Sequence, residues 1–281
     1  MTNRVDTKWL GWQPDVPDFR DKYLAEAPVE AAVESDLTKI FPLPCYNQGE
    51  LGSCTSQATE FATRFARFKR GLPDFPGSRL YVYFNSRKIE GSESSDSGAQ
   101  IRDAIKATVD NGVCHEMIWP YDVIKYAIQP PDAAYKEGAR NQSILYRRVP
   151  QTPEAIRGVL TSGWPVVFGA TLYRSFDSED VARIGVVPMP FASEPTIGGH
   201  AQTICGHSDA RQAYLVRNSW GVWGLPDKPG YSWMPYDYIH NADLCADFWV
   251  ITGVEDSLEP SASTPVKSHG FWGWLTGLFG K

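Results

Sequence analysis

The chain has 281 residues, of which 42% are hydrophobic and 21% are charged, and its formal net charge is −6. These values are ordinary for a globular protein and exclude a predominantly disordered chain. The negative charge provides no basic field, so nucleic acid is not an expected partner.

Targeting signals are not visible in the sequence. The first residues lack the apolar run of a secretory signal, and no segment approaches the roughly 18 consecutive apolar residues of a transmembrane helix. The five cysteines are odd in number and have no dense spacing pattern, which favours reduced thiols over a disulfide framework. We therefore expect a cytoplasmic protein that does not associate with a membrane.

Residues 1–39 are expected to form an extended N-terminal arm, because this segment contains turn residues and little periodicity. Apolar residues at three- and four-residue steps then predict an amphipathic helix that begins at Cys54 and is ended by Gly71 and Pro73. A second helix is expected over residues 78–90.

A third helix shows the clearest amphipathic pattern. Its apolar face lies within residues 101–109, with Ser97 as the expected N-cap and Gly112 in the terminating turn. Thr152 and Pro153 predict the start of a further short helix, because proline is favoured at the first helical position.

From residue 165 onward the pattern changes to β-rich runs bounded by Gly, Pro, Asn or Asp. These runs cover residues 165–172, 201–205, 214–217 and 247–252. Helices dominate the first half of the chain and strands the second, which predicts an α+β fold with two lobes.

A cysteine, a histidine and an asparagine stand in contexts that suit a thiol nucleophile. Cys54 follows Gln48-Gly-Glu-Leu-Gly-Ser where a loop enters a helix, so the unpaired N–H groups of the first turn would favour its thiolate. His200 would supply the cationic partner and the proton for a leaving amine. Asn218 can fix the histidine ring and its tautomer without adding charge.

These segments resemble the papain-like cysteine peptidases, whose helical lobe carries the cysteine and whose antiparallel sheet lobe carries the histidine and asparagine. The resemblance implies a catalytic domain over residues 40–254. It also implies that the side-chain amide of Gln48 and the N–H of Cys54 form an oxyanion hole. In Asn218-Ser-Trp220-Gly, the tryptophan would shield the His–Asn hydrogen bond from water.

The resemblance further implies that an extended peptide adds as a strand to a glycine-rich loop. Ser97 and Gly98 occupy the corresponding region, with a simple helix-capping loop as the alternative. Gly199 and Trp220 complete the expected substrate-binding set, and the expected partner is a peptide or protein substrate. The side chains that the specificity pocket prefers are not readable from the sequence.

Two positions depart from the family pattern. Thr55 replaces the aromatic residue that normally follows the cysteine, and Leu51 stands where secreted members carry a disulfide-bonded cysteine. The arm is also too short for the family's long helical inhibitory propeptide. We expect the arm to strap across the sheet lobe, with a position in or near the cleft as the alternative.

The expected reaction is hydrolysis of peptide bonds through a thioester acyl-enzyme. The same triad could instead transfer the acyl group to an amine, as a transglutaminase-like enzyme does, or could trim peptides from one end. A catalytically decayed peptide-binding module is the non-enzyme alternative. No cofactor or metal is expected, because Cys205-Gly-His207 and Cys114-His115 lack the paired spacing of a zinc site.

The end of the sequence has a different composition. Residues 255–270 are predicted to be a polar linker and residues 271–281 an aromatic C-terminal tail. The segment from Phe271 to Phe279 is expected to dock on a protein partner, with folding back onto its own domain as the alternative.

Overall fold

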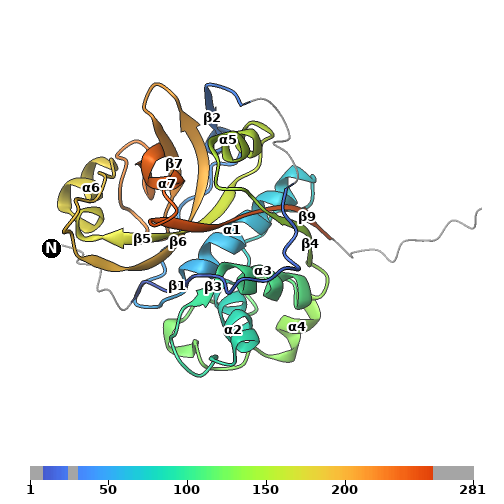
Figure 1. Cartoon of the computed structure of the whole chain (residues 1–281). Helices are drawn as coiled ribbons and strands as arrows, with labels where there is room; N and C mark the ends of the chain where they lie inside the picture. The colour runs from blue at the N-terminus through green and yellow to red at the C-terminus, as the bar shows by residue number, and fades with distance from the viewer. Residues whose placement is uncertain (1–8, 25–30, 256–281) are drawn as a thin grey trace, which may run out of the picture.

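The computed structural model describes residues 9–24 and 31–255 of the chain (Figure 1). The predicted linker lies outside these residues except for Glu255, and the predicted aromatic tail lies wholly outside them.

A seven-stranded antiparallel sheet forms one lobe of the molecule. Six of its strands run in the order β4-β9-β5-β6-β7-β8, and the seventh, β2, pairs with the end of β6. The strands are β2 (Glu34–Asp36), β4 (Ser143–Arg148), β5 (Val166–Tyr173), β6 (Thr196–Ser208), β7 (Ala213–Arg217), β8 (Tyr231–Pro235) and β9 (Cys245–Val254).

The first helices of the chain form the other lobe. Figure 1 shows α2, α3 and α4 gathered on one side of α1, while the sheet lies on the other. The helices are α1 (Cys54–Lys69), α2 (Arg79–Glu90), α3 (Ile101–Asp110), α4 (Asp132–Gly138), α5 (Pro153–Thr161), α6 (Glu179–Ile184) and α7 (Tyr236–His240). The predicted two-lobed α+β architecture is therefore confirmed.

The α1 helix joins the two lobes because it is buried along almost its whole length. Phe61 and Phe65 pack into the large core of the sheet lobe together with Phe168 of β5. Cys54 packs instead into a second cluster, with Ala58 and Trp249 of β9. The cysteine thus lies at the junction of the lobes, on a helix that packing holds in place.

Most expected elements are present, and their ends differ for local reasons. The helix over residues 78–90 begins at Arg79, with the Ser78 hydroxyl accepting from Tyr81 N–H as its N-cap. The prediction of Ser97 as the N-cap of the third helix is wrong. That helix begins at Ile101 with Gln100 as its N-cap, because the preceding residues take an extended conformation as β3 (Ala99–Gln100).

The N-terminal arm is tied to both lobes. Its strand β1 (Trp12–Gln13) pairs in parallel with β3, between the helices and the sheet (Figure 1). Further along, Leu24 N–H donates to Arg148 O, and β2 adds to β6. The arm therefore takes both of the expected positions. Residues near Trp12 lie between the two lobes, in or near the cleft, and later residues of the arm run along the sheet lobe.

None of the helices within the described ranges combines the length and apolar composition that crossing a bilayer requires.

Candidate active site

Cys54 is the first residue of α1, and the loop before it is held by side chains from the helical lobe. Gly52 N–H donates to both carboxylate oxygens of Asp96, at 3.0 and 3.1 Å. The Ser53 and Tyr121 hydroxyls lie 2.5 Å apart. These contacts fix the direction in which the chain enters α1, and therefore the position of the Cys54 sulfur.

His200 lies inside β6, opposite Ala170 of β5, because this strand begins earlier than the sequence pattern predicts. Its Nε2 lies 2.8 Å from Asn218 Oδ1. That oxygen also accepts the N–H of Ser219 at 2.7 Å, which identifies it as the acceptor of the amide. The proton of a neutral His200 must then be on Nε2, so Nδ1 carries the free lone pair.

The lone pair of His200 Nδ1 is available as a base. This atom is buried and has no hydrogen-bond partner among the residues that the structure describes. Cys54 Sγ lies beside the same strand and accepts the N–H of Ala201 at 3.3 Å. The strand thus brings the sulfur next to the residue that follows the histidine.

Three hydrogen bonds fix the orientation of the Gln48 side-chain amide. Its Oε1 accepts the Ser219 hydroxyl at 2.6 Å, and its Nε2 donates to Leu51 O at 2.9 Å. The second Nε2 proton is donated to the carbonyl oxygen of Trp9, at 2.8 Å. A peptide carbonyl of the arm therefore occupies the donor that the family resemblance assigns to an oxyanion.

The arm covers the site. Gly11 O accepts Ala99 N–H at 2.8 Å, and a Cβ on Gly11 would lie 1.8 Å from Gly52 O, so only glycine fits there. Cys54 and His200 are both 0% exposed beneath it. The structure is thus that of a closed site, in which the arm excludes solvent from the sulfur.

Closure changes the protonation of the pair. Burial raises the pKa of the Cys54 thiol to about 11, although the N–H groups of Ala201, Gly11 and the first turn of α1 oppose this shift. Burial lowers the pKa of His200 to about 4, with the Asn218 hydrogen bond acting in the opposite direction. The sequence predicts a thiolate, whereas the covered pair holds a thiol and a neutral imidazole.

Three of the four expected substrate-binding residues lie against the same segment of the arm. Gln13 Nε2 donates to Ser97 O at 2.5 Å, and Gly98 packs directly on Gly11 O. A Cβ on Gly199 would lie 2.4 Å from the carbonyl oxygen of Trp12. The arm thus runs between the Ser97–Gly98 loop and β6, where the family resemblance implies that a peptide binds.

Trp220 lies over the histidine, with ring centroids 4.9 Å apart. This contact with the ring that takes part in the His200–Asn218 hydrogen bond fits the expected shielding role. The catalytic and substrate-binding roles of these residues stay predictions.

No group of three or more metal-ligating side chains occurs within the described ranges. Cys205 is buried in the main core. His207 Nδ1 lies 3.1 Å from the Tyr236 hydroxyl, so this imidazole belongs to a polar cluster of the sheet lobe. His115 stacks on Phe75 and accepts the N–H of Met117.

Sequence reasoning missed three residues that build the site. Ser219 orients Gln48, Asp96 holds Gly52, and Gly11 allows the arm to approach the sulfur. Ser219 lies within the Asn-Ser-Trp segment and could have been considered for this reason. Nothing in the sequence around Gly11 or Asp96 distinguishes them from ordinary turn residues.

No protein-family model matches the chain. A protein of Acanthamoeba polyphaga mimivirus described as peptidase C1-like is 42% identical over 237 residues, which cover 79% of this chain and 75% of that protein. Xylellain, a cysteine protease from Xylella fastidiosa, superposes with a TM-score of 0.83 at 35% identity and covers 91% of this chain and 100% of its own.

A procathepsin B from Trypanosoma congolense has a TM-score of 0.69 at 14% identity, covering 89% of this chain and 88% of its own, which shows the fold alone. The similarity to the mimivirus relative extends over most of both chains. The chain belongs to the papain-like cysteine peptidases.

Proposed function

We propose that the chain hydrolyses peptide bonds with Cys54 as the nucleophile, through a thioester acyl-enzyme. One observation carries the proposal: a peptide carbonyl, that of Trp9, is bound by the Gln48 amide at 2.8 Å, in the site that also contains Cys54. The site therefore already accommodates peptide backbone. The tautomer imposed on His200 by Asn218 supports the same assignment.

In the first half of the reaction, His200 Nδ1 takes the thiol proton and Cys54 Sγ attacks the carbonyl carbon of the substrate. The negative charge on the carbonyl oxygen is stabilised by Gln48 Nε2 and the N–H of Cys54. The C–N bond then breaks, and the imidazolium returns the proton to the leaving amine. Asn218 keeps the ring oriented throughout by accepting from Nε2.

In the second half, a water molecule attacks the thioester carbonyl carbon and gives its proton to His200. The C–S bond breaks, the peptide acid leaves, and the proton returns to the sulfur. The substrate backbone would lie along Ser97 and Gly98, where β3 offers a free N–H once the arm has left.

The test uses a variant in which the arm cannot cover the sulfur. Gly11→Val introduces a side chain against Gly52 O, so it opens the site without altering a residue of the proposed machinery. The parent, Gly11→Val, and Gly11→Val combined with Cys54→Ala or His200→Ala are treated with a peptide-like electrophile and followed by intact mass. We expect one label on Gly11→Val that persists at mildly acidic pH and is lost in both combined variants.

Product analysis on a mixed peptide library then tests the reaction itself. Hydrolysis gives two fragments whose masses sum to the peptide plus water. Products carrying an added amine would instead support the transferase, and labelling only above about pH 8, as for an ordinary thiol, would support a decayed binding module.

Two further predictions belong to this proposal. A cytoplasmic location rests on the odd number of cysteines, all five of which are free thiols.

Docking of the segment from Phe271 to Phe279 on a protein partner rests on its composition alone. Deleting residues 265–281 should leave peptidase activity intact and abolish retention of that partner, and loss of folding would contradict the docking role.

A further inference from the structure

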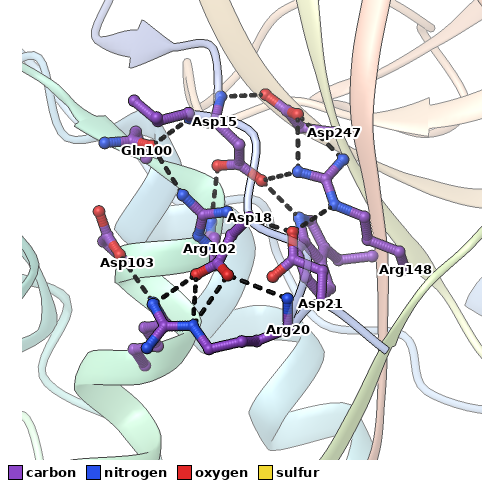
Figure 2. Close-up of polar contacts among 12 residues, drawn as sticks. Asp15, Asp18, Arg20, Asp21, Gln100, Arg102, Asp103, Arg148 and Asp247 are labelled. Atoms are coloured by element: carbon purple, nitrogen blue, oxygen red, sulfur yellow. Dashed lines mark hydrogen bonds and ion pairs between the residues drawn. The ribbon is translucent and has the colours of Figure 1, made fainter. Parts of the chain in front are cut away.

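The arm is anchored on the closed site by a buried cluster of charged residues, which we call the acidic latch. It consists of Asp15 and Asp21 of the arm, Asp247 of β9, Arg148 of β4 and Arg102 of α3. Figure 2 shows the three aspartates gathered about Arg148, with Arg102 beside them.

Arg148 forms ion pairs with all three carboxylates. Its guanidinium lies 2.7 Å from Asp15, 2.9 Å from Asp21 and 3.3 Å from Asp247. Arg102 adds an ion pair to Asp21 at 3.1 Å, and its backbone N–H donates to Asp15. The latch therefore contains three carboxylates and two guanidinium groups, and a negative charge remains when all of them are ionised.

Asp15 and Asp247 are in direct contact. Asp247 Oδ2 accepts the N–H of Asp15 at 2.7 Å and the indole N–H of Trp12 at 3.2 Å. The Asp15 side chain is 0% exposed and its Oδ2 accepts the indole N–H of Trp249. Docking of the arm thus removes one carboxyl from water and brings it beside another.

The backbone of Asp247 is unusual at this contact. It has a φ of +57°, and it lies where the pairing register between β5 and β9 shifts, between Ala246 and Trp249. A bulge of this kind re-aims a side chain, and a non-glycine residue with positive φ persists only where surrounding contacts hold it. The fold thus carries a strained position that directs Asp247 toward the arm.

The charged groups around Asp15 come from five segments of the chain, and acids outnumber bases. They are Asp21 of the arm, Asp247 of β9, Arg148 of β4, Arg102 of α3, and Glu90 of α2, whose pKa the charge of Asp15 raises. Asp103 of α3 faces Glu90 and is partly balanced by Lys106. Asp18 pairs with Arg20 within the arm itself, so this pair can persist whether or not the arm is docked.

We propose that the acidic latch couples closure of the active site to proton uptake at Asp15, so that the arm holds the cleft closed at mildly acidic pH and releases it as the pH rises. The inference concerns access to Cys54 and does not depend on the hydrolysis proposed above.

The direction follows from the two states of Asp15. In the docked arm, burial and the neighbouring Asp247 raise the pKa of Asp15 to about 6, from an ordinary value of 3.8. A released arm is hydrated, and its carboxyl returns toward the ordinary value. Docking therefore takes up a proton between these pH values, and is strengthened as the pH falls through 6. From pH 8 to pH 5 the docking equilibrium should shift about tenfold toward closure.

The experiment measures access to Cys54 in the full chain. Parent and Gly11→Val proteins react with iodoacetamide between pH 5 and pH 8, and peptide mapping gives the rate at Cys54 separately from the other four cysteines. The ratio of the parent rate to the Gly11→Val rate cancels the pH dependence of the thiol and reports closure. We expect this ratio to fall about tenfold from pH 8 to pH 5.

Asp15→Asn supplies a matched variant, because it keeps the shape of the protonated side chain and removes its charge. We expect Asp15→Asn to be closed at every pH, with the low ratio that the parent reaches at pH 5. If this variant does not fold, Asp247→Asn tests the same contact and should reduce the pH dependence. If Gly11→Val does not fold, Trp12→Ser serves as the open reference.

A ratio that is constant with pH, or that falls as the pH rises, would overturn the proposal. So would an Asp15→Asn protein that is open at neutral pH. Equal rates for the parent and Gly11→Val at every pH would show that the arm does not control access to the sulfur. None of these outcomes requires peptide hydrolysis, so failure of the latch is distinguishable from failure of the catalytic proposal.

Discussion

Ser219 fixes the direction in which the Gln48 amide points. Its hydroxyl donates to Gln48 Oε1, and its backbone N–H donates to Asn218 Oδ1. One residue therefore orients two side chains of the proposed machinery. Without the hydroxyl, the Gln48 amide could rotate and present its oxygen to the oxyanion, which would repel it.

We predict that Ser219→Ala lowers kcat/KM about fivefold, since one hydrogen bond contributes about 1 kcal/mol. The rate of thiol labelling at Cys54 should not change, because the sulfur and His200 keep their contacts. Both are measured in the Gly11→Val background to remove the effect of the arm. Ser232→Ala is the control: Ser232 is also buried, and its hydroxyl has no partner within the described ranges. Equal losses in the two variants would contradict the orienting role.

Individual catalytic candidates can be predicted from sequence because their chemistry depends on residue type and immediate context. Cys54 at a helix start, His200 beside a strand and Asn218 after another strand carry that signal, and the structure brings His200 and Asn218 into contact. Gly11 carries no such signal. Its importance arises from the approach of Gly52, a residue 41 positions later in the chain, and only tertiary structure creates that contact.

At the scale of elements, Arg87 near the end of α2 holds the loop over residues 92–98 in place by hydrogen bonds. Its guanidinium is fully buried and donates to the carbonyl groups of Glu93, Ser95 and Tyr126, at 2.9, 2.6 and 2.5 Å. Residues 92–98 form the loop against which the arm docks. A single side chain thus satisfies the backbone of a loop that has no regular structure of its own.

We predict that Arg87→Lys lowers the unfolding free energy by about 2–4 kcal/mol, because one ammonium cannot reach all of these carbonyl groups. The melting temperature should fall by roughly 5–15 °C, and KM should rise because the loop supports Gly98. Calorimetry and steady-state kinetics measure the two effects. Arg64→Lys is the control, because its ion pair with Asp74 is partly exposed and should contribute less than about 1 kcal/mol.

The elements next to this loop show which secondary structure can be predicted from sequence and which cannot. The periodicity of residues 101–109 correctly indicates α3, because amphipathic helices leave a strong repeating signal. The two residues of β3 leave none, since their extended conformation depends on pairing with β1 from the arm. Ser97 therefore resembles an N-cap in sequence, whereas in the structure it lies in the loop before a strand.

At the scale of the whole molecule, the closed state buries titratable groups whose pKa values are shifted in opposite directions. Burial lowers the pKa of His200, His207 and His240, and raises that of Asp15 and Glu90. The histidines oppose folding as the pH falls, because the unfolded chain binds protons that the folded chain does not. The two acids favour folding under the same conditions.

We predict that His200→Gln flattens the dependence of the unfolding free energy on pH. The pKa of His200 is about 4 in the fold and its ordinary value is 6.5, so its contribution is present above pH 6.5 and lost as the pH falls toward 4. Over this range the parent should lose about 1.4 kcal/mol per pH unit through this residue alone, and the variant should not. Urea unfolding at a series of pH values measures the slope.

Asp15→Asn should change the same curve in the opposite sense. With a pKa of about 6 in the fold and an ordinary value of 3.8, Asp15 contributes stability that is fully present below 3.8 and is lost as the pH rises through 6. The Asn variant lacks this gain, so its unfolding free energy should fall more steeply than that of the parent between pH 6 and pH 4. If both variants gave curves parallel to the parent, burial in the closed state would not control the protonation of either group.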